Sequence, residues 1–363
     1  MAFSKEIRIL QLIDSLEAGG AERMAVSYAN ALNRNDGFGA LVTTRSEGSL
    51  KNQLDKNVVY GFLNRKSIFD FKALFFLRRL VVQNKITHIH AHSSSVFFGV
   101  LLKVLQPKLQ LIWHDHYGKS EMLNQRPFLA LKMASLFVSK IIAVNFKLKN
   151  WAQEKLFCAR VVFLPNFTSI SSDNPEKITY LKGIEGKRIV CLANLRPQKN
   201  HLFLLQIAKE IHKTHPDWSF HLVGKDFEDS YSNNLKTEII ALDLADVVFI
   251  YGSREDIPFI LSQSTIGVLT SESEGLPIAI LEYGLHKLPV ISTRVGEIPS
   301  VITDKEGVLI SSNDCCNFVL SLIKMMDDQM MRSTFAANLH DKIIQNYSEE
   351  AVIKLYLKWI NEN

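Results

Sequence analysis

The chain has 363 residues, of which 47% are hydrophobic and 22% charged, and its formal net charge is +5. This length suits two domains of ordinary size, and the composition excludes a chain dominated by disorder or short repeats. The four cysteines have no CxxC spacing. The pattern therefore excludes a disulfide scaffold, and we expect a cytoplasmic location.

Membrane-spanning segments are not indicated either. The charged start of the chain lacks the features of a signal peptide. Residues 69–82, the most apolar region, are interrupted by Lys72, Arg78 and Arg79, whereas a span needs about 18 apolar residues. We therefore expect no export and no transmembrane helix.

Charge is unevenly distributed along the chain. Residues 1–170 carry 23 Lys and Arg against 11 Asp and Glu, a net charge of +12, and residues 171–363 carry 19 against 26, a net charge of −7. Such a split can indicate an anionic membrane surface, a nucleic acid or a phosphorylated substrate facing the basic half. Scattered solvated lysines are the alternative.

The first half alternates short apolar runs with longer amphipathic ones. Alternating strands and helices predict a parallel sheet covered on both faces, which is a doubly wound α/β fold. After the first strand, Gly19 and Gly20 could let the backbone approach a phosphate or sugar, although a tight turn would also favour glycine. The runs are residues 7–13, 21–33, 40–44, 58–62, 69–83, 86–91, 95–105, 109–113, 128–138 and 141–144.

Five histidines gather around the ends of two of these strands: His88, His90 and His92 on one, and His114 and His116 on the next. A zinc site is one interpretation, because imidazoles at short spacing are common ligands. Alternation puts His88 and His90 on one face, but it fixes no third ligand, and neither a cysteine partner nor an HExxH motif is present. We therefore expect no metal.

A linker is predicted at residues 168–186, which contain a Ser-Ser-Asp-Asn-Pro run and two glycines. A second alternation follows, so two Rossmann-like doubly wound domains are expected in series, with ligands in the cleft at the carboxyl ends of the strands. The domains would be residues 1–170 and 171–345, and a helix within 346–363 could pack back on the first. The predicted elements are residues 188–193, 201–212, 219–223, 233–242, 247–250, 265–269, 277–286, 288–292 and 307–310.

Two segments of the second half carry candidate chemistry. Arg196 and Lys199 precede a predicted helix and could clamp a diphosphate. In residues 270–282, Glu274 lies in a loop and Glu282 a turn or two along a helix. One carboxylate could accept both hydroxyls of a ribose and the other could reach a sugar ring, while N–H groups at the helix start would face a diphosphate. Solvated surface residues are the alternative for all four.

The second segment resembles the signature of the retaining GT-B glycosyltransferases of family 4, in which two glutamates separated by seven residues lie in a characteristic context. The resemblance extends over nearly the whole chain, although Pro277 stands where many members have glycine and Asn194 stands at the position of the family arginine. The matching segments are residues 271–275 (SESEG), 280–282 (ILE), 288–290 (LPV) and 295–299 (VGEIP).

The resemblance implies roles for individual residues. Glu282 would hold the donor ribose, Glu274 would contact the transferred sugar, and Lys199 would meet the donor phosphates. His114 would lie beside the donor sugar as a catalytic residue, and His116 could share or replace that role. The remaining donor-binding candidates are Gly19, Gly20, Asn166, Arg196, Gly224, Gly275, Leu276 and Ile278.

The implied activity is retaining transfer of a sugar from a nucleoside diphosphate sugar, as co-substrate, to a hydroxyl of a glycan or lipid-linked acceptor. It would need no cofactor and no metal, and no nucleic-acid partner is expected. A GT-B sugar-nucleotide epimerase and a non-catalytic sugar-nucleotide-binding module are the alternatives.

A peripheral position on the inner face of the membrane is a further expectation. It depends on the amphipathic runs 69–83 and 126–140, in which apolar residues alternate with basic ones. Basic residues near an anionic leaflet attract it electrostatically. The alternative is that these helices only cover the sheet. The basic residues are Lys72, Arg78, Arg79, Lys132 and Lys140.

Overall fold

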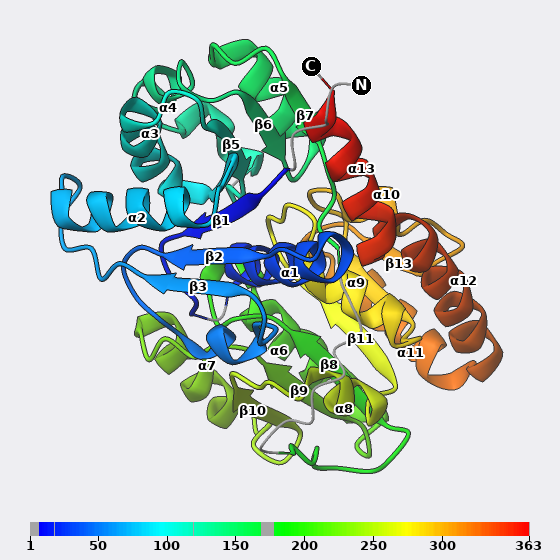
Figure 1. Ribbon diagram of the computed structural model, residues 1–363. Helices are drawn as coiled ribbons and strands as arrows, with labels where there is room; N and C mark the ends of the chain where they lie inside the picture. The colour runs from blue at the N-terminus through cyan, green and yellow to red at the C-terminus, as the bar shows by residue number, and fades with distance from the viewer. Residues whose placement is uncertain (1–6, 18, 119, 168–177, 363) are drawn as a thin grey trace. The chain divides into compact units, whose positions relative to one another are not determined.

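The computed structural model describes residues 7–17, 19–118, 120–167 and 178–362, and the chain divides into two compact units. The first unit comprises Met1–Phe167 and Glu349–Asn363, and the second comprises Thr168–Ser348. Each contains one parallel sheet with helices around it (Figure 1), which confirms the predicted doubly wound architecture. Of the predicted linker, residues 168–177 lie outside the described residues.

The first unit contains a seven-stranded sheet in which every neighbouring pair is parallel. The strand order reverses between β1 and β4, so the loops that follow these two strands diverge at one point. Such a point is where open α/β sheets bind ligands. In spatial order the strands are β3 (Val59–Phe62), β2 (Ala40–Thr43), β1 (Ile9–Ile13), β4 (His88–His92), β5 (Gln110–Asp115), β6 (Lys140–Ala143) and β7 (Val161–Phe163).

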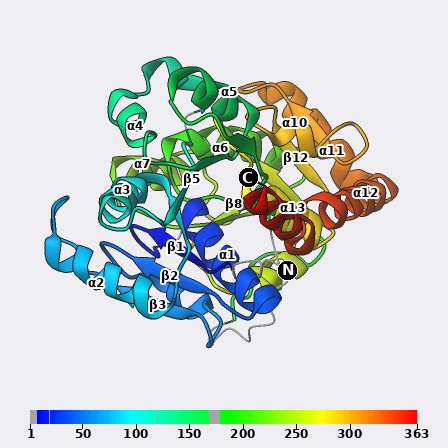
Figure 2. The ribbon, with the colours of Figure 1, turned by 45° about the horizontal axis from the view of Figure 1, so that its top comes forward.

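Alternation along β1 divides the core of this unit into two faces. Leu10 and Leu12 belong to the apolar cluster under α2, α3 and α5, whereas Ile13 packs with α1. On the α1 face, α13 lies beside α1 (Figure 2). The helices of this unit are α1 (Gly20–Asp36), α2 (Phe71–Gln83), α3 (Val96–Leu105), α4 (Leu129–Ala134), α5 (Phe146–Lys155) and α13 (Glu349–Asn361), with short 3₁₀ turns at Ser49–Gln53, Ser93–Ser95 and Ser120–Gln125.

The last helix, α13, is attached to the first unit at both ends. At its start, Glu349 accepts two hydrogen bonds from Arg34 of α1, at 3.1 and 2.6 Å. At its end, the buried Nζ of Lys140 donates to the carbonyl oxygens of Trp359, Ile360 and Glu362. The last carbonyls of a helix have no intrahelical partner and carry partial negative charge, so a buried ammonium stabilises them.

The second unit contains a six-stranded parallel sheet whose order reverses between β8 and β11. The strands, in spatial order, are β10 (Val248–Gly252), β9 (Ser219–Val223), β8 (Arg188–Leu192), β11 (Ile266–Leu269), β12 (Val290–Thr293) and β13 (Val308–Ile310). The helices are α6 (His201–Thr214), α7 (Ser230–Ala241), α8 (Ile257–Ser262), α9 (Ile278–Leu285), α10 (Ile298–Val301), α11 (Cys315–Asp327) and α12 (Gln329–Tyr347), with a 3₁₀ turn at Pro197–Lys199.

Three of these helices are capped by the side chain of an aspartate. Asp229, Asp314 and Asp328 each accept a hydrogen bond from a backbone N–H of the first turn of α7, α11 and α12. Such caps satisfy donors that have no partner in the helix. Within the described residues, no helix is both long enough and apolar enough to cross a membrane.

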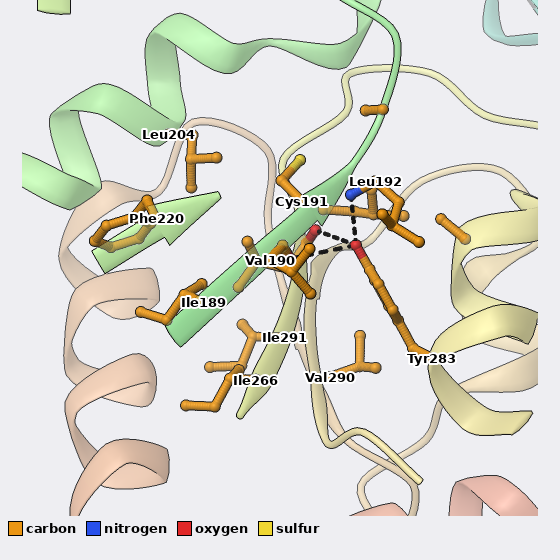
Figure 3. Close-up of a cluster of buried hydrophobic side chains, with 14 of the residues drawn as sticks. Ile189, Val190, Cys191, Leu192, Leu204, Phe220, Ile266, Tyr283, Val290 and Ile291 are labelled. Carbon is orange, nitrogen blue, oxygen red and sulfur yellow. Dashed lines mark hydrogen bonds between the residues drawn. The ribbon is translucent and has the colours of Figure 1, made fainter. Parts of the chain in front are cut away.

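Tyr283 of α9 reaches into the core of the second sheet (Figure 3). Its hydroxyl accepts a hydrogen bond from the N–H of Leu192 at 2.7 Å and lies 3.3 Å from the carbonyl oxygens of Val190 and Val268. The ring fits because β11 has Gly267 opposite it, where a Cβ would come within 2.7 Å of the ring. One side chain therefore joins α9 to both strands of the reversal point.

Candidate functional site

The candidate site of the second unit lies at the reversal point of its sheet. The loop after β8 contains Lys199, and the loop after the neighbouring β11 contains Glu274. Their side chains form an ion pair, with Nζ 2.5 Å from Oε1. The hydroxyl of Ser271 donates to the same carboxylate oxygen at 2.6 Å. The structure therefore brings together two residues that the sequence assigned to different roles.

Backbone contacts hold these two loops together. The N–H of Glu272 donates to the carbonyl of Gln198 at 2.9 Å, and the Thr270 hydroxyl lies within hydrogen-bond distance of the carbonyls of Lys199 and Asn200. Glu274 is buried, and the side chain of Lys199 keeps 20% of its surface exposed. A buried carboxylate needs a charged partner, and the paired loops supply it in a fixed place.

In the matching segment 295–299, the position of the glycine requires a residue without a Cβ. Gly296 adopts φ +56°, and a Cβ there would lie 2.1 Å from the carbonyl oxygen of Glu274. The N–H of Glu297 donates to the carbonyl of Gly275 at 2.9 Å. The loop after β12 therefore braces the loop that contains Glu274, directly before α9.

Helix α9 begins at Ile278, with Pro277 at its N-cap in an extended conformation. Gly275, Leu276 and Ile278 therefore lie at the N-terminal end of the helix, where backbone N–H groups bind anions. Glu282 lies on the same helix, directly before the anchored Tyr283, and is half-buried. Because Tyr283 fixes the rotation of α9, it also fixes the side on which Glu282 lies.

Arg196 and Gly224 lie next to this pair of loops. The exposed guanidinium of Arg196 stacks over the ring of Phe227 at 4.4 Å. Asn194, at the position of the family arginine, accepts a hydrogen bond from the N–H of Lys225. A Cβ at Gly224 would lie 2.2 Å from the carbonyl of Ala193, so only glycine permits the close approach of the β8 and β9 loops.

The remaining candidates belong to the first unit. Gly19 is the N-cap of α1, and Gly20 is the first residue of that helix, directly after β1 and its loop. A Cβ at Gly19 would collide with the carboxylate of Glu22, whereas Gly20 has open space. Asn166 is buried and follows β7.

The histidines of the first unit form a buried cluster on the α1 face of the sheet, packed against Tyr28 of α1 and Tyr356 of α13. Nitrogen atoms of His90, His92 and His114 lie within 4.8 Å of one another. Alternation along the first strand had left the third imidazole unfixed. The third comes from β5, because strand register places His92 beside His114.

Hydrogen bonds already connect these imidazoles. Tyr356 Oη lies 2.9 Å from Nδ1 of His90, and Nε2 of His90 lies 3.2 Å from Nδ1 of His114. The rings of His90 and His114 are stacked, with an interplanar angle of 12°. In the described part of the chain no carboxylate joins the group. The arrangement suits a hydrogen-bonded network, and the absence of a metal stays a prediction.

Burial keeps this network neutral. It lowers the pKa of His90, His92 and His114 well below the ordinary value and that of His116 to about 3, with neighbouring histidines as a secondary cause for the first three. His114 is fully buried, whereas His116 keeps some exposed surface. His116 is therefore the member of the pair that solvent reaches.

Between these two histidines, Asp115 points the other way. Arg126 binds its carboxylate with two hydrogen bonds, at 2.6 and 2.8 Å, and stacks over the rings of Tyr117 and Trp151. This buried pair fixes the end of β5. Arg126, the first residue of the run 126–140, is therefore engaged inside the first unit.

Comparisons with known proteins agree with this architecture. Residues 18–172 match the model of Glycosyltransferase Family 4, and residues 176–346 match that of glycosyl transferases group 1. The chain is 27% identical over 358 residues to the UDP-Gal:alpha-D-GlcNAc-diphosphoundecaprenol alpha-1,3-galactosyltransferase of Escherichia coli, covering 91% of this chain and 90% of that protein.

Two further similarities cover almost the whole chain. The amylovoran biosynthesis glycosyltransferase AmsD of Erwinia amylovora is 22% identical over 360 residues, covering 97% of this chain and 98% of that protein. The crystal structure of Anabaena Alr3699/HepE in complex with UDP-glucose has a TM-score of 0.79 at 17% identity, covering 98% and 100% of the two chains.

Two doubly wound units in series and the likeness to that structure define the GT-B fold. The two family matches together cover most of the chain, and the relatives are named as glycosyltransferases. The chain therefore belongs to the glycosyltransferases of group 1 and family 4, as the resemblance of the segment around Glu274 and Glu282 predicted.

Proposed function

We propose that this enzyme transfers a sugar from a nucleoside diphosphate sugar to an acceptor hydroxyl, with retention of anomeric configuration and without a metal ion. The observation that carries the proposal is the Lys199–Glu274 pair beside the start of α9. It combines a cation, a carboxylate and a helix N-terminus, which are the groups that a sugar diphosphate needs.

Each group has a separate task in the proposed reaction. Glu282 accepts hydrogen bonds from the donor ribose, and the N–H groups at the start of α9 face the diphosphate. Lys199 neutralises the charge that develops on the leaving diphosphate, which lowers the barrier most when the cation is already in place. Glu274 holds that ammonium and contacts the transferred sugar.

The proposed bond changes need no further reactant. The acceptor oxygen attacks the anomeric carbon on the face from which the diphosphate departs. The bond from that carbon to the diphosphate oxygen breaks, the bond to the acceptor oxygen forms, and the leaving phosphate oxygen takes the acceptor's proton. The products are the glycosylated acceptor and the nucleoside diphosphate.

The relatives indicate which donors to test first. The E. coli relative is named for transfer from UDP-galactose, and the Anabaena structure contains UDP-glucose. Uridine diphosphate sugars should therefore be titrated by calorimetry before other nucleotides. Saturable binding of any nucleoside diphosphate sugar supports the proposal, and binding of none of them would contradict it.

Product analysis separates this activity from its alternatives. A sugar-nucleotide epimerase converts the donor without an acceptor, and a non-catalytic module leaves it unchanged. A transferase releases nucleoside diphosphate in proportion to glycosylated acceptor, and the anomeric configuration of the product tests retention. Turnover should persist in EDTA; loss with EDTA and recovery with a divalent metal would contradict the metal-free scheme.

We further propose that the acceptor is carried on a lipid phosphate and that the first unit binds an anionic membrane surface. The E. coli relative is named for a diphosphoundecaprenol acceptor. The support from the molecule is α2: Phe71, Phe75 and Phe76 point outward with 64%, 57% and 52% of their surface exposed. Its other side, including Leu74 and Leu77, packs on the sheet.

Basic residues alternate with these aromatic ones. Lys72, Arg78 and Arg79 are all exposed on α2. On α4, Leu129 and Met133 are also exposed. An apolar helix face with interleaved cations suits the interface of an anionic bilayer, where each basic residue contributes about 1 kcal/mol. Lys140 cannot contribute, because its ammonium is buried against the end of α13.

A further inference from the structure

A hydrogen-bonded chain of three side chains runs from the middle of β1 to the end of β5. Oε1 of Gln11 lies 2.8 Å from Nε2 of His92, and Nδ1 of His92 lies 3.0 Å from Nε2 of His116. Gln11 and His92 have no exposed surface, whereas His116 is partly exposed. This series of hydrogen bonds therefore begins inside the first unit and ends at its surface.

The carboxamide of Gln11 fixes the direction of both hydrogen bonds in this series. A carboxamide oxygen can only accept, so His92 must carry its proton on Nε2. Its Nδ1 then has a lone pair and accepts from His116, which must also carry its proton on Nε2. Nδ1 of His116 is consequently left with a lone pair.

Surrounding rings prevent His92 and His116 from turning. His92 is stacked on His90 with centroids 4.4 Å apart and an interplanar angle of 25°, and His116 packs against His114 with centroids 3.9 Å apart. His90 is itself held by Tyr356 of α13. The imidazole of His116 is thus held between a hydrogen bond and a ring contact.

We propose that Gln11 and His92 are positioning residues that hold His116 in a single tautomer, whose Nδ1 accepts a hydrogen bond from a hydroxyl of the sugar substrate. His116 directly follows β5, at the sheet edge where doubly wound folds bind ligands. A neutral nitrogen lone pair attracts a hydroxyl and repels phosphate oxygens, so His116 would select the sugar rather than the diphosphate. Its low pKa, caused by burial, keeps it neutral at pH 7.

This inference rests on the proposed function for the identity of the ligand, but its first test needs no ligand. The imidazole nitrogens of the ¹⁵N-histidine-labelled full chain should be assigned by long-range ¹H–¹⁵N correlation. His92 and His116 are each expected in one tautomer, protonated on Nε2. A proton on Nδ1 of His116 would overturn the inference.

Removing the amide oxygen of Gln11 tests the direction of these hydrogen bonds. Gln11→Met keeps the length of the side chain, and His116 should then show the mixed tautomers of a free imidazole. Thr43→Val is the matched control, because Thr43 is equally buried on β2 and its hydroxyl contacts Tyr60 instead. Unchanged His116 resonances in Gln11→Met, with a folded protein, would contradict the positioning role.

The second test separates sugar from nucleotide. With the sugar donor found by calorimetry, Gln11→Met and His116→Gln should each lower kcat/KM about tenfold or more, as expected for the loss of one directed hydrogen bond. The affinity for uridine diphosphate alone should not change. His116→Asn, whose amide can place an oxygen near the position of Nδ1, should retain more activity than His116→Gln.

The outcomes distinguish the two proposals. If no sugar nucleotide binds but His116 has the expected tautomer and responds to Gln11→Met, the proposed function fails and the positioning chain stands. If transfer occurs and kcat/KM is unchanged in Gln11→Met, the positioning role fails and the proposed function stands.

Discussion

Lys199 and Glu274 are 75 residues apart in the sequence, and their side chains meet at 2.5 Å because β8 and β11 are neighbours in the sheet. The pair is braced from both loops and by Ser271. An ammonium held this way needs little rearrangement to meet a diphosphate, which is the condition under which electrostatic stabilisation is most effective.

Lys199→Met should therefore lower kcat by about 10²–10³, the range found when one pre-positioned donor is removed from a transition state. Gln198→Ala is the matched control, because the neighbouring loop contact uses only the backbone carbonyl of Gln198. Steady-state turnover of both variants is the measurement. Equal loss in the two would mean that the loop, and not the ammonium, is responsible.

Glu282→Ala should weaken binding of the nucleoside diphosphate by about 1–3 kcal/mol, since ribose hydroxyls lose a charged acceptor. Calorimetry measures this directly, and Glu255→Ala, an exposed glutamate of the same unit, serves as the control. Glu274→Ala should mainly lower turnover instead. Unchanged nucleotide affinity in Glu282→Ala would remove Glu282 from the ribose site.

Tyr283→Phe should lower the free energy of unfolding by about 1–3 kcal/mol, because the buried N–H of Leu192 loses its hydrogen-bond partner while the ring still fills its space. Urea denaturation measures the change. Tyr180→Phe, at an exposed tyrosine of the same unit, should have almost no effect. Nucleotide affinity should also fall in Tyr283→Phe, since α9 carries Glu282.

The buried histidines predict a loss of stability in mild acid. The pKa of His116 in the folded chain is about 3 and that of His201 about 4, in each case because of burial, whereas an unfolded histidine titrates near 6.5. The unfolded chain therefore binds more protons below pH 6.5, and stability falls as the pH drops from there. Each such histidine should remove on the order of 2 kcal/mol between pH 7 and pH 5. Urea midpoints that are equal at these two pH values would contradict this.

Co-sedimentation with vesicles tests the membrane proposal. The protein should bind vesicles that contain anionic lipid at low salt and be released at high salt, because exposed charges are screened beyond a Debye length. Neutralising Lys72, Arg78 and Arg79 together should weaken binding, and replacing Phe71, Phe75 and Phe76 by serine should do so as well. The control is to neutralise three exposed lysines of the second unit, Lys209, Lys287 and Lys305. Equal binding to neutral and anionic vesicles would contradict the electrostatic part.

Sequence periodicity predicted both sheets but missed β7 and α5 of the first unit. The strand β7 has three residues, and α5 has the weakest amphipathic pattern among the longer helices of the first unit. The short β7 and the weakly amphipathic α5 therefore do not stand out from a loop. The motif around Glu274 and Glu282 was found because its residues are close in the sequence.

Contacts between strands could not be foreseen in the same way. The distance from His90 to His114 and from Lys199 to Glu274 depends on strand order and register, which are properties of the folded sheet. For the same reason Lys140 counted as a surface cation in the sequence, whereas its ammonium binds the end of α13. Charge alone does not indicate whether a long side chain has a buried partner.

The attachment of α13 determines how the protein can be divided into fragments. A polypeptide that ends at Phe167 would contain every strand of the first sheet, yet Tyr28, His90 and Lys140 would lose Tyr356 and the carbonyl groups that now cover them. Such a fragment should be poorly soluble alone and should recover when a synthetic peptide of residues 349–362 is added in trans. A fluorescent label on that peptide would report its binding directly. The last helix could then be removed from the histidine cluster and added back as a separate peptide.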